Sequence, residues 1–286
     1  MGCGNTLVLV RANLSIIKSM TPPNFDGIYG MTANPLRQVF MMGTIWCLSN
    51  YIQNSHLNIL EIGSWSGASA LTWGEALEIH NGGKGSLSCI DAWEPYYNSD
   101  EIHDDLSREI NDALSDNEPY NVFMENMEYL PSSVNLTVHR GWSSDVLPLL
   151  KHHNFDLIYI DGDHSYQGVS ADIEASCALV KDGGIICGDD LELQAHQVDA
   201  SIAINRPYLD KFIDEVSETV FHPGVTLAVG NKFGPVSSWY GFWAMQKNDG
   251  RWEKVSLEGM PPHIPSTISA ENLIGLKALL METGIF

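Results

Sequence analysis

Short apolar runs alternate along this chain with longer segments in which apolar residues recur at helical spacing. The runs lie at 58–62, 86–90, 134–138, 155–160 and 183–187. Those at 155–160 and 183–187 are short, rich in β-branched residues and bounded by Gly and Asp, as buried strands are. The segments with helical spacing predict helices over 35–52, 68–79 and 169–180. Strands that alternate with helices form βαβ units, whose strands lie parallel in one sheet.

The last third of the chain continues the alternation. Strands are expected at 225–229 and 240–245, after a long helix over about 198–220, and a further helical segment is expected near 270–281. The loop 230–238 leaves no room for a crossover helix, so the final strand should run antiparallel. The sequence therefore predicts an α/β fold with a doubly wound, mostly parallel seven-stranded Rossmann-like sheet and an antiparallel last strand.

One large domain with two appendages accounts for the length of the chain. Its 286 residues, 44% of them hydrophobic, can bury a sizeable core. We expect an N-terminal helical extension at 1–54, the main domain at 55–247 and a C-terminal tail at 248–286. From residue 93 to about 117 the composition turns polar and acidic, with a short helix near 106–114, which predicts a lid-like insertion in the main domain.

Charge and composition narrow the class of partner. With 36 acidic against 15 basic side chains, the net charge of −21 repels phosphate backbones and argues against nucleic acid. No apolar run is long enough for a membrane span, and the N-terminus lacks the layout of a secretory signal. The five cysteines show no CxxC pair. We therefore expect a soluble, cytoplasmic protein. The first six residues match a myristoylation pattern with Cys3 as a possible second acylation point, although a frayed start is the simpler interpretation.

Three acidic side chains follow two of the predicted strands at their carboxyl ends. Asp161 follows the strand 155–160, and Asp189 and Asp190 follow the strand 183–187. Because these strands belong to one βαβ unit, they should end at the same edge of the sheet, where open α/β sheets bind ligands. Negative charges that lie so close together need a cation between them. The alternative is that the three aspartates only cap strands and form turns, which Asp also favours.

A second set of residues surrounds the end of the first predicted strand. The segment from Glu61 to Ser69 has glycines at 63 and 67, where the strand bends into a helix and backbone can approach a ligand. Asp91, at the tip of the next strand, is suited to accept hydrogen bonds from ribose hydroxyls. Together these features indicate a nucleoside-containing cofactor. A dinucleotide site would prefer GxGxxG, and a tight turn without any ligand remains an alternative.

In order and spacing, these motifs resemble the class I S-adenosylmethionine-dependent methyltransferases. The run Asp-Gly-Asp-His-Ser-Tyr at 161–166, followed by Gly-Asp-Asp at 188–190, is similar to the metal-dependent O-methyltransferases, and most similar to the macrocin and mycinamicin sugar O-methyltransferases. The resemblance covers about residues 55–247. The glycine motif alone is weakly specific, whereas the combined set is strongly specific.

The resemblance implies a role for each matching residue. Trp142 and Ser143 would meet the adenine, and Asp91 would hold the ribose. The full cofactor set is Glu61, Gly63, Trp65, Gly67, Ser69, Asp91, Trp142 and Ser143. Asp161, Asp189 and Asp190 would bind Mg²⁺ or another divalent cation, which prefers oxygen ligands.

The proposed catalytic residues are His164 and Asp161. Catechol-type relatives have a Lys three residues after the first metal ligand and an Asn as the last ligand, whereas this chain has His164 and Asp190 there. His164 would act as the general base, since an imidazole accepts a proton near neutral pH. Alternatively, His164 only caps the next helix or bonds Asp163.

The sequence therefore predicts a metal-dependent O-methyltransferase that uses S-adenosylmethionine. Its partner would be a small-molecule hydroxyl acceptor, namely a sugar or a glycosylated natural product, and the chain could form a homo-oligomer. The alternatives are a catechol-type enzyme for small aromatics, a glycosyltransferase that uses Asp161 and Asp163 as a DxD motif, and a noncatalytic cofactor-binding module. The aromatic cluster at 239–243 is expected to pack in the core rather than to bind the acceptor.

Overall fold

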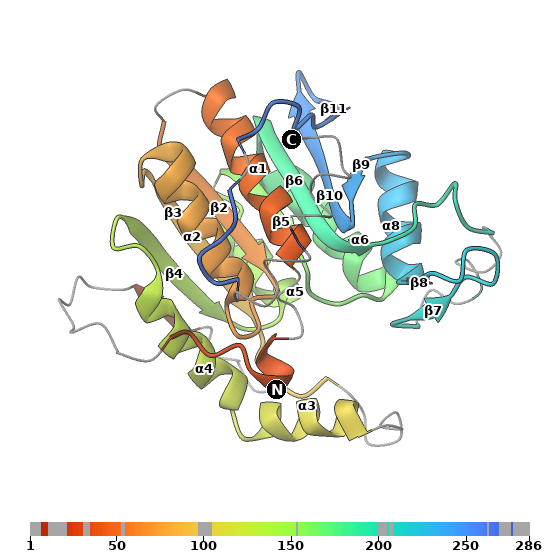
Figure 1. Cartoon of the computed structure of the whole chain (residues 1–286), viewed down its shortest axis with the longest axis horizontal. Coiled ribbons are helices and arrows are strands. Elements are labelled where there is room, and N and C mark those ends of the chain that lie inside the picture. Colours follow the sequence, from red (N-terminus) through yellow and green to blue (C-terminus); the bar gives the residue numbers. More distant parts are fainter. Residues whose placement is uncertain are drawn as a thin grey trace.

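The computed structural model describes residues 7–10, 22–30, 35–52, 55–96, 105–152, 154–199, 205, 209–261, 263–268 and 276 (Figure 1). Within this part of the chain, nine strands form one sheet in the order β1-β4-β3-β2-β5-β6-β10-β11, with β9 paired to β10. The parallel centre of the sheet consists of β2 (Leu57–Ile62), β3 (Gly85–Asp91), β4 (Val134–Arg140), β5 (Phe155–Ile160) and β6 (Val180–Leu191). The predicted doubly wound, mostly parallel sheet is thus confirmed.

Antiparallel strands close both sides of the parallel centre. On one side β10 (Gly241–Asn248) runs antiparallel to β6, as predicted for the last strand of the motif, and pairs in turn with β11 (Arg251–Lys254) and β9 (Ser237–Trp239). On the other side β1 (Leu7–Val10) pairs antiparallel with β4. These added strands make the sheet wider than the seven strands that the sequence predicts.

Helices cover both faces of the sheet, and each face has its own apolar core. On one face α1 (Pro35–Tyr51) packs beside α2 (Ala68–Asn81), as Figure 1 shows. The other face is covered by α5 (Ser143–Val146), α6 (Tyr166–Leu179) and α8 (Pro223–Phe233). β5 and the middle of β6 are buried on both sides and their sequences are nearly continuously apolar, whereas burial partly alternates along β3 and β4.

The strand order places the ligand-binding edge. Counted along the chain, β3 and β4 lie to one side of β2, whereas β5 and β6 lie to the other, so the order reverses between β2 and β5. In open α/β sheets the crevice beyond the carboxyl ends of the strands at such a reversal is where ligands bind. The register pairs Ile62 at the end of β2 with Ile160 of β5 and with Ile90 of β3. The turns that follow these strands therefore begin at one level of the sheet.

The strand predicted at 225–229 is wrong, because these residues lie in helix α8. The run Val-Thr-Leu-Ala-Val has strand-like composition, but Pro223 stands in the first turn of the helix, where its missing N–H and fixed φ cost nothing. Val225, Ala228 and Val229 are buried in the core that α8 shares with α6. Packing of this apolar face overrides the local β-propensity.

The helix predicted over 198–220 is wrong from residue 209 onward, whereas residue 205 is helical as predicted. Residues 209–222 contain a small hairpin of β7 (Phe212–Ile213) and β8 (Val220–Phe221), joined through a turn in which Asp214 accepts hydrogen bonds from Ser217. Most of 200–208 falls outside the described residues. The acidic, turn-forming composition of 214–218 explains why no helix continues there.

The appendages are described only in part. The N-terminal extension includes the 3-10 helix η1 (Gly27–Gly30) besides β1 and α1, while the first six residues and most of the segment near 270–281 lie outside the described residues. In the predicted lid, α3 (Asp105–Ser115) matches the expected short helix, and α4 (Glu118–Asn126) with the 3-10 helix η2 (Met127–Tyr129) follows it. A further 3-10 helix, η3 (Leu147–Leu150), follows α5. No helix in the described part of the chain is long and apolar enough to cross a membrane.

Candidate active site

The turn between β2 and α2 is shaped by two glycines in the left-handed region. Gly63 has φ 87° and Gly67 has φ 91°, a conformation that side chains disfavour. A Cβ at Gly63 would collide with the backbone carbonyl of Asp161, and one at Gly67 would lie 2.6 Å from Met127 and 3.1 Å from Phe123. The turn therefore requires glycine for two reasons, its backbone conformation and the close approach of neighbouring chain.

Asp91 holds this turn in place from the end of β3. One carboxylate oxygen accepts the backbone N–H groups of Ser64 (3.0 Å) and Trp65 (2.8 Å), and the other accepts the N–H of Trp93 (2.7 Å). Burial raises the pKa of Asp91, while these three N–H donors and Arg140 oppose the rise. Two carboxylate oxygens have about four acceptor positions, so roughly one remains for a ligand hydroxyl.

Trp65 and Ser69 lie in the predicted cofactor turn and are only partly buried. The Trp65 indole N–H donates to the carbonyl of Ile28 in η1 (3.0 Å), so η1 covers the turn from the N-terminal extension. Ser69 lies in the first turn of α2 and bonds the carboxyl of Glu61. The extension and the predicted lid meet at this point, because Ile28 and Trp65 pack with α3.

Glu61 lies wholly buried beneath the turn. Its carboxylate accepts hydrogen bonds from Ser64 Oγ (2.8 Å) and Cys89 Sγ (3.3 Å). Burial raises the pKa of Glu61 to about 7, against the effect of the Ser69 and Ser64 hydroxyls. This residue therefore supports the turn from inside, and any effect on a cofactor passes through the serines that it bonds.

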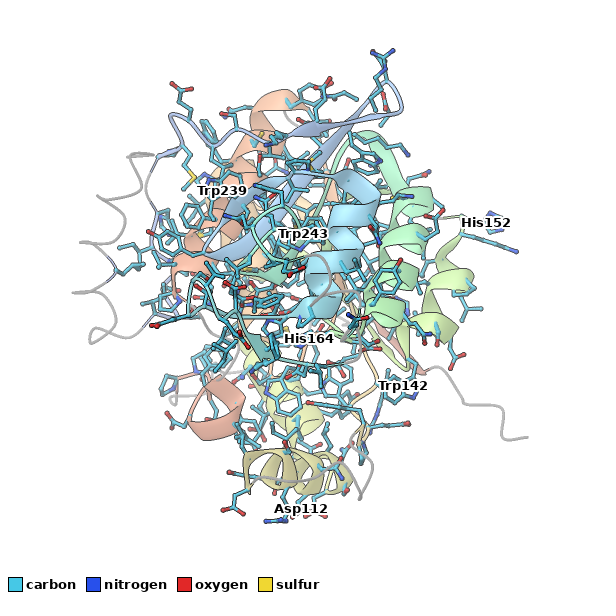
Figure 2. The ribbon with its side chains drawn as sticks, turned by 90° about the vertical axis from the view of Figure 1, so that its right-hand side faces the viewer. Asp112, Trp142, His152, His164, Trp239 and Trp243 are labelled. Atoms are coloured by element: carbon cyan, nitrogen blue, oxygen red, sulfur yellow. The ribbon has the colours of Figure 1, made fainter. Side chains whose placement is uncertain are left out.

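Trp142 and Ser143 follow β4, at the side of the turn predicted to receive an adenine. The Trp142 side chain is 43% exposed and lies below and to the right of His164 in the view of Figure 2. Ser143 is partly buried at the start of α5 and bonds the buried carboxyl of Asp172 in α6. The two residues thus differ in their surroundings: Ser143 is hydrogen-bonded to a buried side chain, whereas Trp142 is exposed to solvent.

Asp161 and Asp189 meet around a buried arginine that the sequence analysis missed. Arg37, in the apolar helix α1, contacts the carboxylate of Asp189 and lies 3.8 Å from that of Asp161. Tyr159 donates its hydroxyl to Asp161 (2.9 Å). Burial raises the pKa of Asp161 to about 6, and the Asp190 charge adds to this while Arg37 and His164 oppose it. A single cation inside an otherwise apolar helix is the sequence signal that could have identified Arg37.

Asp190 points to the other side, toward His164. Its backbone has φ 60°, and its carboxylate lies 2.9 Å from His164 Nε2. Burial would raise the pKa of Asp190, but the charges of His164, His222 and Arg37 hold it well below its usual range. Burial alone would lower the pKa of His164, but Asp190 and Asp210 raise it well above its ordinary value.

His164 does not have the structural role that sequence alone left open. Ser165, not His164, caps α6, by accepting the N–H of Gly168 (3.1 Å). The partner of Asp163 is also Ser165, whose backbone and hydroxyl donate to it at 2.7 and 2.8 Å. His164 instead has a carboxylate at each ring nitrogen, with Asp210 Oδ1 at 2.6 Å from Nδ1.

Three further residues complete this cluster and were not identified from the sequence. Asp210 comes from the segment before β7, Glu192 follows β6, and His222 stands directly before α8. His222 Nδ1 lies 3.1 Å from Glu192 Oε2. They lie in parts of the chain where the secondary structure was predicted wrongly or where no motif guided the choice.

The donor set at the sheet edge fits a hard cation. Ligand atoms of Asp161, His164 and Asp190 lie within 4.8 Å of one another, and carboxylate oxygens are the ligands that Mg²⁺ prefers. Among the described residues, no such group of histidines, cysteines and acids includes Asp189, whose carboxylate contacts Arg37. The structure thus brings together two of the three predicted ligands, and Asp189 adjoins them through the arginine.

The aromatic cluster divides between core and surface. Phe242 and Trp243 are buried, Trp239 is half-buried, and Tyr240 is 47% exposed. Phe40 of α1 stacks on both Trp239 (ring centroids 5.7 Å apart) and Tyr240 (6.1 Å). Core packing accounts for most of this cluster.

A separate cleft of about 470 Å³ lies between η1 and α3. None of the predicted site residues lines it, and six carboxylates with a single arginine dominate its wall. The sheet edge, where the glycine turn, Asp91, Asp161 and Asp190 follow adjacent strands, remains the better candidate for the active site because it combines a cofactor turn with titratable groups.

Comparison with known proteins agrees with this location. A family model described as a methyltransferase domain matches residues 60–191, and no curated protein matches the chain significantly. Similar solved structures include an O-methyltransferase from Bacillus cereus in complex with SAH, with 22% identity over 55% of this chain and 57% of that chain and a TM-score of 0.34. Others are the O-methyltransferase NovP (17% identity, 73% and 79% covered, TM-score 0.47) and CalS11, a TDP-rhamnose 3'-O-methyltransferase (14%, 73% and 79%, TM-score 0.41).

The match to the Bacillus cereus enzyme spans little more than half of that protein. The family match, in contrast, begins inside β2 and ends at the last residue of β6, so it contains every residue that the sequence assigned to the cofactor, the metal and the chemistry. Residues 60–191 of this chain are therefore similar to a methyltransferase domain.

Proposed function

We propose that this protein is a metal-dependent O-methyltransferase whose acceptor is a hydroxyl of a sugar or a glycosylated natural product. The observation that carries the proposal is the meeting of Asp161, His164 and Asp190 at the sheet edge beside the glycine turn. A carboxylate pair with an adjoining imidazole supplies both a cation site and a proton acceptor, which O-methylation of an unactivated hydroxyl needs. The sugar class rests on the resemblance of the motifs at 161–166 and 188–190.

The cofactor would lie along the turn at Gly63 and Gly67. S-adenosylmethionine, when bound, supplies an electrophilic sulfonium methyl group. Asp91, besides holding the turn, has about one acceptor position left for a ribose hydroxyl. Trp142, whose side chain is partly exposed, would stack on the adenine.

A divalent cation would be held by Asp161 and Asp190, with Asp189 as a third ligand once it leaves Arg37. Such a cation makes a bound hydroxyl more acidic and fixes its position. Arg37 would then compensate the remaining negative charge from inside the fold, since it already lies against Asp161 and Asp189.

His164 is the proposed proton acceptor. Transfer forms a bond between the acceptor oxygen and the methyl carbon, breaks the carbon–sulfur bond with its electron pair going to sulfur, and leaves the hydroxyl proton for His164 Nε2. Of the interactions that raise the His164 pKa, the Asp190 charge is the largest. Engagement of Asp190 by a cation would therefore free Nε2 to accept a proton near neutral pH.

The test is a screen of sugar and catechol acceptors, with release of S-adenosylhomocysteine as the signal. Methyl transfer that is lost in EDTA and restored by Mg²⁺ is expected. Asp161→Asn and Asp190→Asn should abolish it and still bind S-adenosylmethionine in calorimetry, and Asp145→Asn, an exposed aspartate of α5, is the matched control. Full activity in EDTA would refute metal dependence, and transfer to catechols alone would refute the acceptor class.

The catalytic role of His164 needs its own variant. General-base assistance is typically worth about 10²–10⁴ in rate, so His164→Ala should lower kcat by about that factor while cofactor affinity barely changes. A near-normal kcat with a good acceptor would assign proton removal to the cation and its carboxylates.

A further inference from the structure

Two histidines meet on the far side of Asp190. The rings of His164 and His222 pack edge to face, with centroids 4.9 Å apart. One nitrogen of each ring and one carboxylate oxygen of Asp210 lie within 4.8 Å of one another. Two imidazoles and a carboxylate at this separation form a compact donor set, and neither His222 nor Asp210 has a part in the methyl transfer proposed above.

His222 has one ring nitrogen that the protein leaves unused. The residue is only 4% exposed, its Nδ1 lies 3.1 Å from Glu192 Oε2, and its Nε2 has no hydrogen-bond partner among the described residues. Since a carboxylate accepts, the proton belongs on Nδ1, which leaves a buried lone pair on Nε2. A buried nitrogen without a partner is costly, and metal-binding histidines are characteristically oriented by a carboxylate on the other nitrogen.

The backbone holds the two histidines together. His222 stands immediately before α8, and a Cβ at Gly224 would collide with the carbonyl of His164 and lie 2.5 Å from the backbone nitrogen of Tyr166. Figure 2 shows His164 near one end of the light-blue ribbon of α8. The start of α8 is therefore packed directly on the loop after β5, so the backbone contact keeps the two histidines close to each other.

We propose that His164, His222 and Asp210 form a second cation site, for a divalent transition-metal ion. Imidazole nitrogens suit Zn²⁺, Co²⁺ and similar ions, whereas Mg²⁺ prefers oxygen ligands, so the donor set separates this site from the carboxylate site. Glu192 orients His222 without being a ligand. The five carboxylates here, at positions 161, 189, 190, 192 and 210, outnumber the one permanent cation among them, Arg37, which favours a further cation.

Occupation of this site would stop methyl transfer. An ion bound to one nitrogen of His164 leaves the only ring proton on the other nitrogen, so the ring cannot accept the proton of a hydroxyl. This consequence rests on the proposed function, whereas the existence of the site does not. The protein would then be activated by Mg²⁺ and inhibited by a transition metal at a neighbouring position.

The site is tested by titrating metal-free protein with Co²⁺, followed by visible absorption and calorimetry. His222→Gln should lower the Co²⁺ affinity at least about tenfold. Glu192→Gln removes only the carboxylate that orients His222, and it should lower the Co²⁺ affinity by at most about 10- to 100-fold. The matched control is His263→Gln, because His263 also pairs with a carboxylate, Glu75 Oε1 at 3.0 Å, far along the chain from the site. Asp189→Asn should keep the Co²⁺ site.

Equal Co²⁺ affinity in wild type, His222→Gln and Glu192→Gln would overturn the proposal, as would a loss confined to Asp189→Asn. Circular dichroism checks that each variant is folded, and Glu192→Gln leaves the buried ring in place if His222→Gln fails to fold. In the activity assay at saturating Mg²⁺, Zn²⁺ should inhibit wild type and His263→Gln but not His222→Gln. Equal inhibition of all three proteins by Zn²⁺ would refute the inhibitory role of the site. If the protein shows no methyl transfer at all, the proposed function fails, and the Co²⁺ titration alone tests whether the site exists.

Discussion

Asp172 is a buried side chain that makes the free energy of unfolding depend on pH. It is 3% exposed on α6, and burial raises its pKa to about 6, with Ser143 opposing the rise and the Asp163 charge adding to it. Because the folded pKa lies above the unfolded value near 3.9, this group favours the folded state most at low pH. That contribution is lost as pH rises from about 4 to about 6.

Asp172→Asn should therefore stabilise the protein more at pH 8 than at pH 5. The two pKa values give a difference of about 1 kcal/mol in the change in free energy of unfolding between these pH values. Urea denaturation at both pH values measures it, with Asp116→Asn at an exposed position of the chain as the control. A gain that is independent of pH would show that the Asp172 pKa is not raised.

Asp91 is a second residue whose structural role changes an expectation. Its sequence position suggests a ligand contact only, so that Asp91→Ala would weaken cofactor binding and leave the fold intact. Three backbone N–H groups bonded to its carboxylate indicate instead that the substitution frees the whole turn. We expect Asp91→Ala to lower the free energy of unfolding by about 2–4 kcal/mol as well as to abolish S-adenosylmethionine binding. Denaturation and calorimetry measure the two effects, and unchanged stability would return Asp91 to a purely ligand-binding role.

At the level of elements, the ends of helix α2 offer a matched pair of glycines. Gly67 before the helix and Gly82 after it both have positive φ, at 91° and 60°. A Cβ at Gly67 would press on Met127 and Phe123, whereas one at Gly82 would meet nothing within 4 Å. Alanine should thus cost only backbone strain, about 1 kcal/mol, at Gly82, but strain and overpacking, about 2–4 kcal/mol, at Gly67.

The same pair separates stability from cofactor binding. Gly67→Ala should lower S-adenosylmethionine affinity, because the turn must shift to make room for the methyl group, while Gly82→Ala should bind as the wild type does. Calorimetry on both variants is the measurement. Equal affinities would mean that the cofactor does not lie along this turn.

The parallel strands could be predicted because the residues that flank each apolar run indicate where the strand begins and ends. The sequence placed strands at 58–62, 86–90 and 155–160, and the structure has Leu57–Ile62, Gly85–Asp91 and Phe155–Ile160. The run at 225–229 has the same composition but forms a helix, since its state is decided by packing against α6 and β6 rather than by local preference. Short apolar runs without alternation are ambiguous in this way.

Only those residues of the candidate site that lie at the ends of strands could be predicted from the sequence. Asp91, Asp161 and Asp190 lie at the carboxyl ends of β3, β5 and β6, which are parallel strands of one sheet, so topology alone brings them to one edge. Arg37 lies in helix α1, before the first parallel strand, and His222 lies directly before α8, after the last one, and their positions depend on tertiary packing that no local motif encodes. The pairing of Asp189 with Arg37 instead of with the other carboxylates is a consequence of that packing.

At the scale of the whole molecule, charge links stability to cations. A net charge of −21 destabilises the compact state by self-repulsion, so any salt should raise the thermal midpoint somewhat. A specific site adds a separate, saturable increment: an ion that binds only the folded chain stabilises it by about 2.7 kcal/mol at 100 times its dissociation constant. The two contributions can be distinguished by comparing MgCl₂ with NaCl at equal ionic strength.

We expect MgCl₂ to raise the thermal midpoint above that in NaCl, and the difference to saturate with Mg²⁺ concentration. Asp190→Asn should remove this difference while keeping the increase caused by NaCl, because it deletes one carboxylate of the cation site but leaves the overall charge nearly unchanged. Asp145→Asn changes the net charge equally at an exposed position and should keep both effects. If MgCl₂ and NaCl act alike on the wild type, the acidic edge of the sheet responds to ionic strength alone, and Asp161 and Asp190 hold no specific cation in the absence of substrate.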